Sequence, residues 1–161
     1  MSTTYFADSS ALPLQSHPAE MTVPAQAAPC AKTSLHNLVS ELMQSLLPLT
    51  IRRHNLILNE IPRDLYVLAD ESMLAYVLWP LINGAIQSTQ NECIHIEAII
   101  VDDHMMILIK DVGTYFYHTI SKEYRQVQHV AEKLGGSISI ENGKDYGTNA
   151  AFCISNSLLA A

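Results

Sequence analysis

The chain has 161 residues, of which 48% are hydrophobic and 16% are charged, and its formal net charge is −7 at pH 7. This length and composition are typical of one globular domain with a hydrophobic core, and they argue against two domains or a wholly disordered chain. The acidic balance argues against nucleic acid or an anionic membrane as a partner, so a polyphosphate site would need local cations, backbone amides or a metal.

The three cysteines, Cys30, Cys93 and Cys153, are odd in number and widely spaced. This spacing predicts neither a disulfide framework nor a zinc site, and Cys93 and Cys153 are expected to be small buried hydrophobes. No apolar run reaches the roughly 18 to 20 residues that a membrane-spanning helix needs. The first residues also lack the basic and apolar stretches of a signal peptide. We therefore expect a cytoplasmic protein with no membrane partner.

Residues 1–31 contain no lysine or arginine and are dominated by alanine, proline, serine and threonine. No helical or strand period persists through them, which predicts a disordered tail or linker. The alternative is a docking peptide that folds on a partner.

Helical periodicity begins after residue 34. Apolar residues recur at helical spacing over 35–54, with Ser34 as a plausible N-cap and a bend expected at Pro48. Residues 55–61 alternate as a strand does, and 65–70 form a second short extended piece.

A second helix is predicted over residues 71–89, with Asp70 as its cap. Two apolar strands follow at 93–101 and 105–110, joined by a turn at 102–104. A third helix covers 121–134 and is expected to stop at two glycines. A final hairpin pairs residues 137–141 with 148–155.

This order predicts an α/β fold, specifically a two-layer sandwich in which about three helices cover one face of a mixed, mostly antiparallel sheet. Repeated strand-helix-strand units are lacking, which argues against a doubly wound nucleotide fold. The domain is expected over residues 32–157, followed by a short tail at 158–161.

Five stretches carry a family resemblance. Residues 70–78 and 81–89 are similar to the helix that holds the Asn box of histidine kinases, and 107–113 is similar to the strand that enters the first glycine box. Residues 130–140 and 147–152 are similar to the closing helix, double glycine and Gly-Thr strand.

The chain therefore resembles the ATP-binding domain of sensor histidine kinases over about residues 35–156, in the order and spacing of that family. These domains belong to the Bergerat-fold (GHKL) group, shared with gyrase and MutL-type ATPases. The resemblance implies an α/β sandwich, a nucleotide pocket and a place in two-component signal transduction.

The resemblance also implies which residues would hold the nucleotide. The family's magnesium-binding Asn falls on Gly84, which has no side chain, and the adjacent Asn83 is roughly 100° round the helix. Asp111 and Gly113 match the adenine side of the pocket, and Asn83 and Thr148 are taken with them as the remaining candidate nucleotide-binding residues.

Three departures from the family pattern affect the part of the pocket that would hold the phosphates. Tyr115 replaces the second glycine of the first box, and only residues 116–120 stand where the family has a lid and a second glycine-rich box. The third helix opens without glycine amides for phosphate, although Lys122 and Arg125 could attract an anion.

The remaining family glycines, Gly135, Gly136 and Gly147, are interpreted as turn glycines that need a positive φ. The histidines show no metal-ligand spacing, so no metal site is expected.

The leading hypothesis is a degenerate histidine kinase-like domain that acts without catalysis, as a signalling module that contacts a kinase or response regulator. No cofactor is expected. One alternative is a weak, magnesium-dependent ATP-binding histidine or serine kinase-type domain with a remodelled phosphate site that uses Asp111. The other is a phosphotransfer or kinase-docking protein with His36 as its phosphoacceptor.

Overall fold

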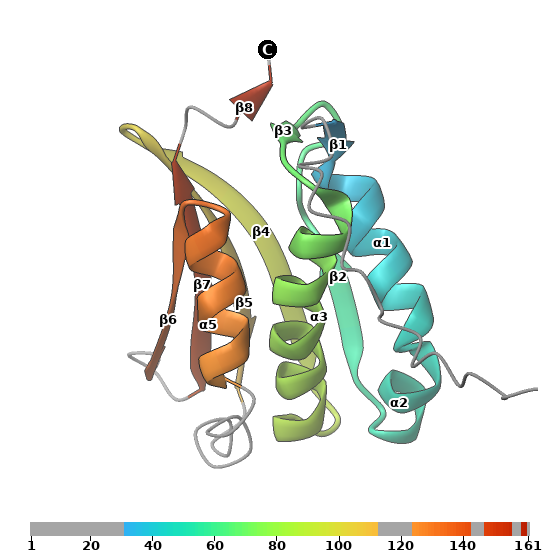
Figure 1. Cartoon of the computed structure of the whole chain (residues 1–161). Coiled ribbons are helices and arrows are strands. Elements are labelled where there is room, and N and C mark those ends of the chain that lie inside the picture. The colour runs from blue at the N-terminus through green and yellow to red at the C-terminus, as the bar shows by residue number, and fades with distance from the viewer. Residues whose placement is uncertain (1–30, 113–123, 143–146, 156–158, 161) are drawn as a thin grey trace, which may run out of the picture.

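The structure is a computed structural model that describes residues 31–112, 124–142, 147–155 and 159–160. Its main sheet has five strands in the order β2-β4-β5-β7-β6 (Figure 1). The β2 and β4 strands are parallel, and the other neighbouring pairs are antiparallel. The strands are β2 (Leu56–Asn59), β4 (Cys93–Val101), β5 (His104–Asp111), β6 (Gly136–Asn142) and β7 (Thr148–Ser155).

Helices cover one face of this sheet, with α3 between α1 and α5 in Figure 1. The described helices are α1 (Leu35–Ser45), α2 (Leu47–Arg52), α3 (Glu71–Ser88) and α5 (Tyr124–Lys133). The predicted two-layer α/β sandwich with a mixed sheet is therefore confirmed.

Helix starts follow the predicted caps. The backbone N–H of Asn37 donates to the Ser34 hydroxyl over 3.4 Å, and that of Met73 donates to the Asp70 carboxylate over 3.0 Å. The expected bend near Pro48 is a full break, because α1 ends at Ser45 and α2 begins at Leu47 with proline in its first turn. Proline is tolerated there because the first N–H groups of a helix have no intrahelical acceptor.

A second, three-stranded sheet has the order β1-β3-β8 and is antiparallel throughout. It consists of β1 (Lys32–Ser34), β3 (Tyr66–Leu68) and β8 (Leu159–Ala160). Sequence reasoning found β3 but neither β1 nor β8. Strands of two or three residues are too short to show an alternation of apolar and polar side chains.

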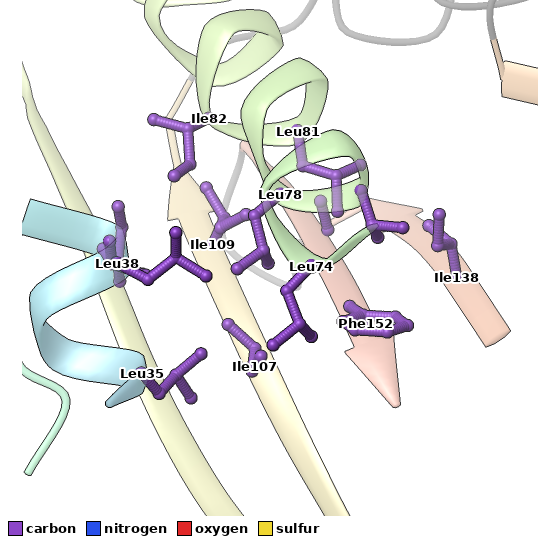
Figure 2. Close-up of a cluster of buried hydrophobic side chains, with 14 of the residues drawn as sticks. Leu35, Leu38, Leu74, Leu78, Leu81, Ile82, Ile107, Ile109, Ile138 and Phe152 are labelled. Carbon is purple, nitrogen blue, oxygen red and sulfur yellow. The ribbon is translucent and has the colours of Figure 1, made fainter. Parts of the chain in front are cut away.

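The core lies between the helices and the main sheet (Figure 2). Every second residue of β5, from Met105 through Ile107 to Ile109, is buried against the helix layer. From α3, the residues Leu74, Val77, Leu78, Leu81, Ile82, Ala85 and Ile86 are buried in the same core. The broad apolar face predicted for this helix is therefore confirmed.

Cys93 and Cys153 are half-buried, so the expectation that both are buried is wrong. Each alternates with buried neighbours, such as Ile94 beside Cys93 and Phe152 beside Cys153. Successive strand residues point to opposite faces, so both thiols lie on the face turned away from the helices. Within the described residues, no helix combines the length and apolar character needed to cross a bilayer.

Candidate functional site

Asp111 and Thr148, two of the candidate residues, lie next to each other in the main sheet. Asp111 ends β5, Thr148 begins β7, and the two are direct partners in the antiparallel register. Both are buried, with 7% and 2% of their surface exposed. A buried carboxyl group and a buried hydroxyl-bearing residue thus lie side by side at one end of the sheet.

Gly147 makes this juxtaposition possible. Its φ is +110°, a conformation that other residues rarely adopt. A Cβ atom placed there would lie 2.0 Å from the Asp111 carbonyl oxygen and 2.8 Å from the Val112 Cα atom. Glycine therefore lets the chain entering β7 pass against the backbone of Asp111, and the positive φ predicted for Gly147 is confirmed.

The other two family glycines differ from each other. Gly135 has a φ of +72° just after α5, and a Cβ there would meet no atom within 4 Å. Gly136 is not among the positive-φ residues, so the expectation for it is wrong. It must be small for another reason, because a Cβ would lie 2.4 Å from the Cys153 carbonyl oxygen in the neighbouring strand.

Asn83 and Gly84 are half-buried on the last two turns of α3. The Asn83 side-chain oxygen accepts a hydrogen bond of 3.3 Å from the Gln87 side-chain amide, one turn further along the helix. This contact engages the side-chain oxygen of Asn83 with a neighbour on the exposed surface of the helix. Position 84, a glycine, offers no side-chain oxygen as a ligand.

The C-terminal end of α3 is held from outside the helix, which sequence reasoning missed. The Asn55 side-chain amide donates to the carbonyls of Ile86 and Thr89 over 3.1 and 3.0 Å, and the Arg53 guanidinium donates to the carbonyl of Gln87. The helix has no basic residue in its own last turn, so these donors satisfy carbonyls that would otherwise lack partners. Asn55 looked like the start of a strand, and no local pattern signals this role.

α5 is tied to β6 by two side chains. The Tyr124 hydroxyl donates to the Ile138 carbonyl over 2.9 Å, and the Ile138 N–H donates to the Gln128 side-chain oxygen over 3.1 Å. Burial raises the pKa of the Tyr124 hydroxyl above its ordinary value of 10.0, which keeps the hydroxyl protonated as a donor.

Solved structures similar to the chain are histidine kinases. The nucleotide-free catalytic domain of histidine kinase ThkA is 20% identical, with a TM-score of 0.67 over 78% of this chain and 96% of that one. Histidine kinase AdeS of Acinetobacter baumannii is 17% identical, with a TM-score of 0.67 over 78% and 66%. Full-length ShkA in complex with AMPPNP is 15% identical, with a TM-score of 0.63 over 85% and 33%.

The fold is that of a histidine-kinase catalytic domain. At 20% identity or less, the likeness concerns the fold alone. The chain spans about a third of full-length ShkA and about two thirds of the AdeS structure. No protein-family model matches the sequence, and no curated protein matches it.

Within this histidine-kinase fold, α3 and the β5 and β7 ends carry Asn83, Asp111, Gly147 and Thr148, which the sequence motifs had selected. Because Gly84 has no side chain and Asn83 bonds to Gln87, the donors of α3 do not fit a magnesium ion at that position. Gly113, Tyr115, residues 116–120 and Lys122 lie outside the described residues, and Arg125 is exposed on α5.

His36, the candidate phosphoacceptor, lies in the first turn of α1 and is half-buried. Its Nδ1 atom is 2.7 Å from the Ile61 carbonyl oxygen, so this nitrogen carries the hydrogen and donates it. The Asn59 side chain donates in turn to the His36 carbonyl over 3.0 Å. Both bonds fasten α1 to the segment around the end of β2.

Proposed function

We propose that the chain is a non-catalytic domain of the histidine-kinase type, which works in signal transduction by contacting a protein partner such as a kinase or response regulator. The observation that carries the proposal is the state of α3, where Gly84 stands at the magnesium position and the neighbouring Asn83 amide is engaged by Gln87. A helix without an oxygen ligand there cannot hold magnesium against phosphates in the way that the resemblance implies.

The packing of the domain supports the view that it folds without a bound nucleotide. The core runs continuously from α1 through α3 to α5 and consists of apolar side chains. The polar contacts at the end of α3 come from Asn55 and Arg53 and need no bound phosphate. Loss of the nucleotide would therefore leave a folded surface available for protein contacts.

A second candidate is weak nucleotide binding, favoured by the buried Asp111 beside Thr148. A buried carboxylate can accept a hydrogen bond from an adenine amino group, so the adenine end of the pocket could act without phosphoryl transfer.

Thermal unfolding with and without nucleotide separates the two candidates. The proposal predicts the same melting temperature with Mg-ATP, ADP or adenosine as without them, because a ligand that does not bind cannot shift the unfolding equilibrium. Stabilisation that disappears in Asp111→Asn and persists in Asp103→Asn would favour the second candidate. Asp103 is the matched control because it is exposed in the turn between β4 and β5.

A further inference from the structure

The two edges of the main sheet differ in how they are covered. β6 forms one edge, and the C=O and N–H groups of Ile138 in this strand are bonded to the side chains of Tyr124 and Gln128 on α5. β2 forms the other edge, and no strand among the described residues pairs with its outer side (Figure 1). An uncovered edge is a template for pairing with a further strand.

The main-chain groups at the open edge of β2 follow from its pairing with β4. The N–H groups of Leu56 and Glu60 donate over 2.9 and 2.8 Å to carbonyls of β4 and of the residue before it. Successive residues of a strand direct their main-chain groups to opposite sides, so those of Ile57 and Asn59 point away from β4. Two donors and two acceptors therefore lie along the open edge, and no other described residue bonds to them.

β2 also lacks the features that protect edge strands in other proteins. Its four residues, Leu56–Asn59, include no charged residue and no proline, and its register with β4 contains no bulge. Its one polar side chain is turned toward α1, because the Asn59 amide donates to the His36 carbonyl over 3.0 Å. Neither charge nor shape therefore prevents a further strand from pairing with β2.

An apolar groove of about 220 Å³ lies beside this edge, and its lining contains no charged residue. The lining residues are Met43 and Gln44 of α1, Leu47, Thr50 and Ile51 of α2, Asn55, and Leu56 and Ile57 of β2. Three of them, Leu47, Ile51 and Leu56, are large hydrophobic residues that are 51%, 63% and 59% exposed. Such a lining selects apolar side chains, because a charged group would lose hydration there without gaining a partner.

We propose that the open edge of β2 binds an extended segment of a partner protein, which adds a strand to the main sheet. The main-chain groups of the segment bond to those of Ile57 and Asn59, and every second side chain lies in the apolar groove. The segment therefore has apolar residues at alternate positions and no proline where its N–H groups meet β2. Because β2 has only four residues, the matching partner is a short linear segment.

The β2 edge includes neither Asp111 nor Gly84, so strand binding does not depend on whether the domain binds nucleotide. Calorimetry with Mg-ATP and an experiment on the β2 edge can therefore fail separately.

Hydrogen exchange of the full chain, followed by NMR, tests the edge directly. The probe is a capped peptide of alternating valine and threonine, and its twin has the same side chains on methylated backbone nitrogens. Without peptide, the amides of Ile57 and Asn59 should exchange faster than those of Leu56 and Glu60, which donate to carbonyls. The plain peptide at about ten times its dissociation constant should slow Ile57 and Asn59 about tenfold, because most of the chain is then bound. The twin should not slow them.

Three results of this experiment would overturn the proposal. Slow exchange of Ile57 and Asn59 without peptide would mean that a second copy or another part of the chain already covers the edge. Equal slowing by the methylated twin would mean that main-chain hydrogen bonds are not involved. Unchanged exchange with the plain peptide at about 1 mM would mean that the edge binds no strand.

Two isoleucines of similar exposure test the groove. Ile51→Lys places a charge in the groove and should weaken binding of the plain peptide about tenfold or more. Ile100→Lys is the matched control and should change nothing, because Ile100 is 55% exposed on β4 and does not line the groove. Unchanged affinity in Ile51→Lys, or an equal loss in Ile100→Lys, would rule out binding at this edge and groove.

Discussion

At the scale of single residues, two glycines near the two ends of the same hairpin illustrate different constraints. Gly147 has both a positive φ and a neighbouring backbone too close for any side chain. Gly135 has the positive φ but open space around it. The first residue shapes the contact between β7 and the Asp111 backbone, whereas the second only reverses the chain after α5.

These glycines should therefore differ in their response to alanine. Gly147→Ala should lower the free energy of unfolding by about 3 kcal/mol or more, because the clash adds to the backbone strain. Gly135→Ala should cost only about 1 kcal/mol, from strain alone. Urea unfolding of the two variants and the wild type gives the comparison, and equal losses would show that the close approach at Gly147 is unimportant.

At this scale, the sequence could predict only part of the candidate site. Asp111 and Thr148 were selected by motif, and their pairing follows from the antiparallel register of β5 and β7. The hydrogen bond between Asn83 and Gln87 was not predicted, because both a nucleotide ligand and a helix-surface pair are compatible with an Asn at that position.

At the scale of elements, α3 depends on segments far from it in sequence. Its start is capped locally by Asp70, as helix sequences often show. Its end is held by Asn55 and Arg53, more than 30 residues earlier in the chain. The connection between α2 and β2 therefore acts as the C-terminal cap of the helix that carries the candidate site.

Asn55→Ala should lower the free energy of unfolding by about 1 to 3 kcal/mol, because two carbonyls at the end of α3 lose their donor. The control is Asn37→Ala, an exposed position on α1 that should change stability by less than about 0.5 kcal/mol. Denaturant titration measures both. Equal effects of the two substitutions would mean that water replaces Asn55 at the helix end.

The elements that were predicted well share one property, a long stretch with a clear period. The bounds predicted for β4 and β7 agree with the structure, and α3 differs by one residue. β1 and β8 were missed because they are short and gain stability only by pairing with β3. Such pairing depends on tertiary structure, which a local pattern does not encode.

At the scale of the whole molecule, the fold is that of a histidine-kinase catalytic domain, and we propose that its α3 lacks the side chain that would bind magnesium. The core that holds the helices on the sheet consists of apolar side chains. Under the proposal, such a domain keeps its architecture while its function becomes one of protein contact.

Titration calorimetry of the full chain with Mg-ATP tests the central proposal most directly. The account predicts no binding heat at nucleotide concentrations up to about 1 mM, because α3 offers no magnesium ligand at position 84. A dissociation constant in the micromolar range for Mg-ATP would contradict it.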